Sequence, residues 1–177
     1  MVAGEGFEPS TFSLTLCQGC VSRHGRKKVR ELRSERKIIK MTEKFNGIIY
    51  LAVFIIHFLG FGIYAYQMII NNKKFRAKFE MDETATPVMR MIGASFLGAL
   101  LMALYIMFIR PGGAEGAWAF FNLVFVQNLC IFIVNTYSIK IDKTGIKNDS
   151  NEGVIAPLVF TILSAVLCYG LADKIYI

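Results

Sequence analysis

Four uninterrupted apolar runs constrain the fold of this chain more than any other feature of its sequence. They cover residues 46–70, 88–109, 117–138 and 154–172, and none has Asp, Glu, Lys or Arg in its central part. A helix needs about 20 apolar residues to cross the hydrocarbon core of a bilayer. A charge at the centre of such a helix costs about 3 kcal/mol. We therefore expect four transmembrane helices.

The segments between the runs are short, about 17, 7 and 15 residues. Short connections force consecutive helices to run antiparallel, so the sequence predicts an all-α fold, an integral membrane up-down four-helix bundle formed by residues 41–177. Thr86 and Pro87 are typical of a helix start, with Thr86 as N-cap. Pro157 is expected in the first turn of the fourth helix, where a missing N–H costs little.

The second run is rich in small residues at helical spacing. Such residues let helix backbones approach closely in lipid, where no hydrophobic force drives helices together. This pattern predicts that the second helix is a central packing helix, and the same residues would suit a dimerisation face. The residues concerned are Ala94, Ser95, Gly98, Ala99 and Ala103.

Polar side chains at similar depth on all four helices predict a polar layer near the middle of the bilayer. The layer consists of His57, Gln127, Asn128, Ser95, Thr161 and Ser164. One interpretation is interhelical hydrogen bonding, worth about 0.6 kcal/mol per pair. The other is a pocket for a small amphiphile (a quinone, a haem or a lipid), with His57 as ligand or hydrogen-bond partner. Because the spans hold a single histidine, bis-histidine haem ligation would require a dimer.

Charged residues at the ends of the spans suggest two interfacial ion pairs, Arg90 with Glu152 and Arg110 with Asp173. The spans themselves hold no carboxylate, which argues against proton-coupled transport. Serine-hydrolase, zinc-protease and phosphate-binding motifs are missing from the sequence. Cys17 and Cys20 have metal-site spacing but no second ligand pair. We therefore expect no catalytic residues, no metal site and no required cofactor.

The stretch "TPVMRMIGASFLGALLMAL", with Arg90 at the membrane edge followed by Gly93 and Gly98, resembles the DoxX-like group of small bacterial four-helix membrane proteins. The resemblance covers residues 46–172 in topology and this one stretch in motif. It implies a four-helix bundle and a partnership with a redox or oxidative-stress system. It assigns no active residue.

The basic residues predict an orientation. Residues 71–90 and 139–153 hold eight Lys or Arg, whereas the opposite side, counted from Met41, holds Lys44, Arg110 and Lys174. By the positive-inside rule the two long loops lie in the cytoplasm and both termini outside, in a bacterial inner membrane. Residues 1–40 contradict this orientation, since they add nine Lys or Arg to the outer side.

We interpret residues 1–40 as a disordered or partly helical basic tail from a mis-assigned start. The tetrapeptide Gly6-Phe7-Glu8-Pro9 can be encoded by the antisense strand of a tRNA gene, which makes Met41 the expected start. A basic arm that binds anionic lipid or RNA is the alternative. With the tail discounted we expect no nucleic-acid partner.

Three functions fit these features. The first is an accessory or structural membrane subunit that acts through helix packing, as a homo-oligomer or within a larger complex. The second is a binder or redox partner of a small hydrophobic molecule at the polar layer. The third is an oligomeric channel or transporter. In each of them membrane lipids surround the protein.

Overall fold

The computed structural model describes Leu32, residues 41–142 and residues 151–177. The chain separates into two units, residues 1–37 and 38–177, and the helices discussed here belong to the second. The predicted basic tail therefore lies outside the described residues, apart from Leu32. The same holds for Lys143 and Lys147 of the second long loop.

Four helical segments dominate the described part. They contain α2 (Ile48–Ile69), α4 (Thr86–Leu104), α5 (Trp118–Thr136) and α6 (Glu152–Gly170). The π-helical turns η2 (Tyr105–Ile109) and η3 (Tyr137–Asp142) extend α4 and α5, and the turn η1 (Glu83–Ala85) precedes α4. Two short helices, α3 (Asn72–Lys78) and α7 (Ala172–Ile175), follow α2 and α6. Each long segment is apolar and long enough to cross a membrane. The prediction of an all-helical chain with four apolar spans is confirmed.

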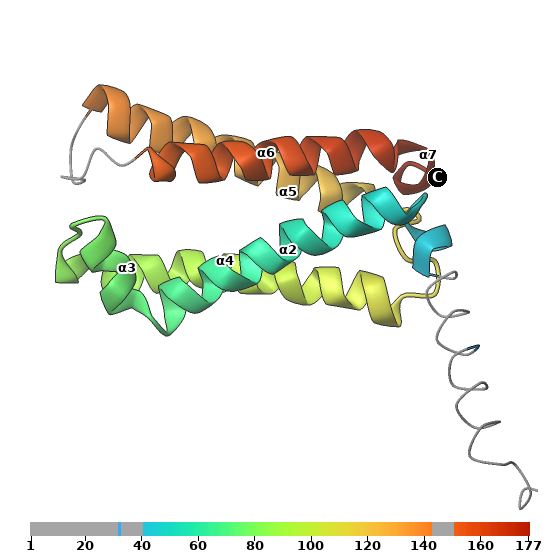
Figure 1. Cartoon of the computed structure of the whole chain (residues 1–177), viewed down its shortest axis with the longest axis horizontal. Coiled ribbons are helices and arrows are strands. Elements are labelled where there is room, and N and C mark those ends of the chain that lie inside the picture. Colours follow the sequence, from blue (N-terminus) through green and yellow to red (C-terminus); the bar gives the residue numbers. More distant parts are fainter. Residues whose placement is uncertain (1–31, 33–40, 143–150) are drawn as a thin grey trace, which may run out of the picture. The chain divides into compact units, whose positions relative to one another are not determined.

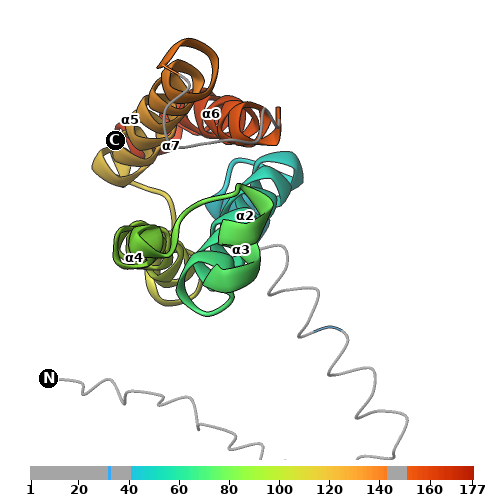
Figure 2. The same ribbon diagram turned by 90° about the vertical axis from the view of Figure 1, so that its left-hand side faces the viewer.

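The long helices form two antiparallel pairs. α2 packs along α4 and α5 packs along α6, and the pairs meet mainly where α2 contacts α6. Figure 1 shows the pairs from the side, and Figure 2 shows the four helices end-on at the corners of a square. The expected up-down order is confirmed. Many large apolar side chains remain exposed on the outside of these helices, which places apolar surface where lipid contacts it.

One end of the bundle is tightly closed. Residues 41–47, the 110–117 loop and α7 meet there, and they bury Phe45, Ala114, Leu171 and Ile175 completely. The Nδ2 of Asn46 donates to the carbonyl oxygen of Gly170 over 3.2 Å and to the Asp173 carboxylate over 3.0 Å. The backbone N–H of Gly116 donates to the carbonyl oxygen of Lys174 over 3.1 Å. We call this region the closed end.

The start of α4 differs from the sequence prediction. The cap is Asp82, whose Oδ1 accepts hydrogen bonds from the backbone N–H and the hydroxyl of Thr84, both over 2.9 Å. The helical chain thus begins at Glu83, one 3₁₀ turn earlier than expected. Thr86 already lies inside the helix, and its hydroxyl is buried without a partner among the described residues.

Pro157 also lies deeper in its helix than predicted, because α6 begins at Glu152. Proline has no N–H, so the carbonyl of Gly153, four residues earlier, receives no hydrogen bond from it. The side chain of Asn135 on α5 supplies the missing donor, with Nδ2 3.1 Å from the Gly153 oxygen. The interruption in α6 is thereby satisfied from the neighbouring helix.

Candidate functional site

A cavity of about 530 Å³ lies in the half of the bundle remote from the closed end. Its walls are formed by the first half of α4, the second half of α5 and the first half of α6. Tyr64 of α2 also lines it. Phe75 of α3 and Phe79 complete it at the membrane edge. The cavity exists because α4 packs chiefly on α2, which leaves the side between α4 and α5 open.

The cavity opens sideways, toward the surroundings of the bundle. Ile92 on α4 and Cys130 and Val134 on α5 line it and are themselves exposed. Most of the lining is apolar and includes the rings of Phe96 and Phe160. The exposed Ile92, Cys130 and Val134 mark the open side of the cavity.

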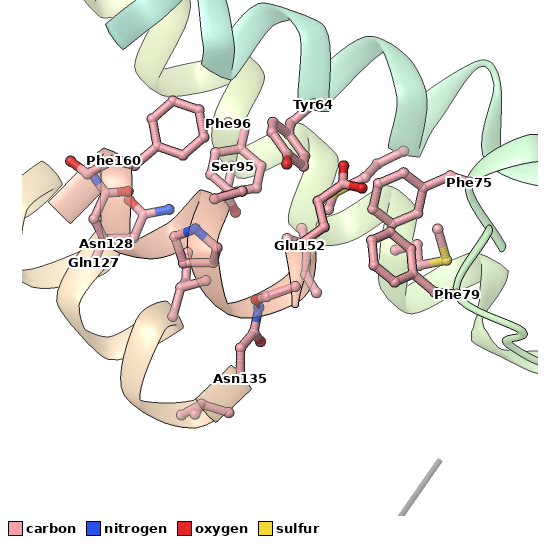
Figure 3. Close-up of a pocket in the computed structure, with 18 of the residues that line it drawn as sticks. Tyr64, Phe75, Phe79, Ser95, Phe96, Gln127, Asn128, Asn135, Glu152 and Phe160 are labelled. Atoms are coloured by element: carbon pink, nitrogen blue, oxygen red, sulfur yellow. Dashed lines mark hydrogen bonds between the residues drawn. The ribbon is translucent and has the colours of Figure 1, made fainter. Parts of the chain in front are cut away.

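The inner end of the cavity carries uncharged polar side chains. These are Gln127 and the buried Asn128 of α5, whereas Ser95 of α4 lines an exposed part of the cavity. Figure 3 shows Gln127 and Asn128 at one end, with Phe75 and Phe79 at the other. The Ser95 hydroxyl donates to the Met91 carbonyl over 3.4 Å. Gln127 has no hydrogen bond within the described part of the chain. This end can therefore form further hydrogen bonds.

Asn128 links the cavity to a polar cluster in the core. Its Nδ2 lies 3.3 Å from Ser164 Oγ, 3.4 Å from the Phe160 carbonyl oxygen and 3.5 Å from His57 Nε2. His57 is completely buried, with ring contacts to Phe58, Phe61 and Phe160. The histidine ring is not part of the cavity lining. His57 therefore contacts Asn128 from the core and not from the cavity.

The six residues of the predicted polar layer are thus divided in space. Asn128 contacts both His57 and Ser164, whereas Ser95 and Gln127 line the cavity and have no hydrogen bond to these three residues in the described part of the chain. Thr161 donates to the Pro157 carbonyl of its own helix over 2.8 Å. It is buried but joins no other helix through that bond.

The charges at the membrane edges pair differently from the prediction. Glu152, which lines the outer end of the cavity, forms an ion pair with Lys78, the last residue of α3. Asp173 accepts from Asn46. In the described part of the chain, neither Arg90 with Glu152 nor Arg110 with Asp173 forms an ion pair. The reason is α3, a helix that the sequence analysis did not anticipate and that brings Lys78 to Glu152.

The small residues of α4 are also divided. Ala103 is buried in the core and Ala99 is half-buried, whereas Ala94, Ser95 and Gly98 are exposed. The close approach to α2 occurs instead at Gly93, where an added Cβ would lie 2.8 Å from Ile69 Cγ1. An added Cβ at Gly98 would meet no atom within 4 Å.

Asn135 and the aromatic lining of the cavity were not anticipated as site residues. One signal in the sequence pointed to Asn135. It lies seven residues after Asn128, on the same face of α5, and a proline in a neighbouring span leaves one carbonyl in need of a donor.

The fold and the cavity define a class, a small polytopic membrane protein with a cavity in its helix bundle. Comparison with protein-family models, with curated proteins and with solved structures finds no match to this chain. No family is therefore identified, and the DoxX-like resemblance is not supported.

Proposed function

We propose that the protein binds a small amphiphilic molecule from the bilayer in the cavity between α4, α5 and α6. The observation that carries this proposal is the cavity itself, about 530 Å³ with an apolar lining and a few polar groups at its inner end. Volumes of about 300–1,000 Å³ with a mostly apolar lining are typical of ligand sites. The exposed lining residues at its mouth suit a ligand that arrives through the lipid.

The membrane topology that we propose from the basic residues would place this cavity in one leaflet of the bilayer. The cavity lies in the half of the bundle that carries α3, η1 and η3, and these belong to the two basic loops. If the positive-inside rule sets the topology of a bacterial inner membrane, the cavity draws its ligand from the cytoplasmic leaflet.

Filling the cavity tests the proposal. Ser95→Phe places a large side chain in the cavity, whereas Ala94→Phe places it on the neighbouring exposed position, which does not line the cavity. The full chain is reconstituted in phosphatidylcholine vesicles with a long-chain alcohol that carries a photoreactive diazirine. We expect labelling of cavity residues in the wild type and in Ala94→Phe, and loss of it in Ser95→Phe. Equal labelling of all three would contradict the proposal.

A second candidate is an accessory or structural subunit that acts through helix packing. Its support is the exposed pair of small residues Ala94 and Gly98, one turn apart on α4, since an added Cβ at Gly98 would meet no described atom within 4 Å. Gly98→Phe would disrupt contact with a second copy or a partner subunit. Single-molecule photobleaching in vesicles would show a fall in copies per complex, and an unchanged distribution would argue against self-association.

A further inference from the structure

We infer that the ligand of this cavity carries an uncharged hydroxyl group, which donates a hydrogen bond to Oδ1 of Asn128. The inference rests on the proposed function, because it assigns a ligand class to the same site. It follows from how the Asn128 amide is held, from the Gln127 side chain and from the charges around the cavity.

The orientation of the Asn128 amide is fixed by its neighbours. The Phe160 carbonyl can only accept a hydrogen bond, so the atom 3.4 Å away must be the amide nitrogen. Ser164 Oγ lies 2.8 Å from the Phe160 oxygen and 3.0 Å from the Thr161 oxygen, and its proton is used there. Toward Asn128 the serine oxygen therefore accepts, which also requires Nδ2.

This arrangement leaves the other atom of the amide for the ligand. The described hydrogen bonds of Asn128 all involve Nδ2, so Oδ1 can still accept a hydrogen bond from a ligand. Asn128 lines the cavity, and its neighbour Gln127 contributes an amide that has no bond within the described chain. A hydroxyl satisfies both residues, since it donates to Asn128 Oδ1 and accepts from the Gln127 amide.

The charge distribution excludes a charged head at this depth. Among the described residues that line the cavity, Glu152 is the one that carries a charge, and it lies at the outer end paired with Lys78. A carboxylate, phosphate or ammonium at the inner end would have no opposite charge beside it, at a cost of about 3 kcal/mol or more near the bilayer centre. A neutral head avoids that cost.

The test uses four diazirine probes that share one alkyl chain and end in a hydroxyl, a methyl ether, a carboxylate or a trimethylammonium group. Each is added at the same mole fraction to phosphatidylcholine vesicles that contain the full chain, and labelled residues are located by peptide mass spectrometry. We expect the alcohol to label the cavity about fivefold more than the ether, since the ether lacks the donor of one hydrogen bond worth ~1 kcal/mol. Both charged probes should label it less than the alcohol.

Variants assign the effect to Asn128. Asn128→Leu should lower alcohol labelling to the level of the ether and leave ether labelling unchanged. The matched control is Asn122→Leu on the same helix, because Asn122 bonds to Tyr176 outside the cavity. Equal labelling by alcohol and ether in the wild type would overturn the inference without any variant. So would preferred labelling by a charged probe, and in both cases the proposed function would stand. If no probe labels the cavity, the proposed function itself fails.

Discussion

Asn135 on α5 donates a hydrogen bond to the carbonyl oxygen of Gly153 on α6, and that carbonyl is the one that Pro157 leaves without a backbone donor. A gap in the hydrogen bonding of one helix is thus filled by an amide from the next. The bond joins α5 to α6 beside the cavity, since all three residues line it. This contact holds α5 to α6 in the half of the bundle that contains the cavity.

The first prediction concerns this bond. Asn135→Leu should destabilise the bundle by about 1 kcal/mol, because the Gly153 carbonyl loses the donor that replaces the missing N–H of Pro157. In a Pro157→Ala background the alanine N–H can donate to Gly153, so the same change should cost much less. Reversible unfolding in mixed micelles measures both costs. Equal costs in the two backgrounds would show that Asn135 does not compensate for the proline.

The second prediction compares two glycines of α4. Gly93→Ala should destabilise the bundle by about 1–3 kcal/mol, because the new Cβ collides with Ile69 Cγ1 at 2.8 Å and Met68 Cβ at 3.0 Å. Gly98→Ala is the matched control, with open space around the new Cβ, and alanine favours a helix over glycine by ~1 kcal/mol. The free energy of unfolding of both variants is measured in micelles. A larger loss of stability in Gly98→Ala than in Gly93→Ala would contradict the close approach of α4 to α2 at Gly93.

The third prediction concerns His57 and Asn128. Each of His57→Phe and Asn128→Leu removes one side of the 3.5 Å contact between them and leaves the other side buried. The double variant leaves neither unpaired, so its loss of stability should be smaller than the sum of the single losses, by about 0.6 kcal/mol. A double-mutant cycle of unfolding free energies measures this coupling. Strictly additive losses would mean that the contact contributes nothing.

The fourth prediction concerns pH. The backbone N–H and the hydroxyl of Thr84 hold the pKa of the Asp82 carboxyl below its usual value. A folded-state pKa below the unfolded one stabilises the fold above the unfolded pKa and loses that contribution as the pH falls through the folded pKa. Asp82→Asn should therefore be less stable than the wild type near neutral pH, and the difference should disappear in acid.

Carbon NMR of a labelled Asp82 provides the direct measurement. Thr84→Val removes the hydroxyl but keeps the backbone donor, so the pKa of Asp82 should rise only part of the way toward that of a free aspartate. A pKa unchanged by Thr84→Val would show that the hydroxyl bond does not matter.

The apolar runs were sufficient to predict the four helices and their alternation, because the cost of unsatisfied backbone groups in lipid leaves few other structures. The ends of the helices were predicted less well. Thr86 looked like a cap from its place beside Pro87, yet Asp82 four residues earlier competes with it and forms the cap. Local sequence cannot decide between two capping residues when a 3₁₀ turn fits between them.

A pocket at the polar layer was one of the two interpretations of the sequence, but its position between α4, α5 and α6 was not predictable, because it depends on how the helix pairs pack and not on any one helix. The polar residues around it were visible in the sequence, but their division into a buried cluster and a cavity-facing set required the α5–α6 geometry. The pairing of Glu152 required α3, whose seven residues carry too weak a pattern to be expected beside longer apolar runs.

The cavity is open on the side where Ile92, Cys130 and Val134 are exposed. For the proposed ligand, this opening determines how binding must be measured. A ligand that enters from the bilayer is already dissolved there, so its aqueous concentration does not set occupancy. The relevant variable is its mole fraction among the lipids. Two laboratories that use the same total ligand but different amounts of lipid would report different apparent affinities for the same protein, and only titrations at fixed lipid composition and varied dilution would agree.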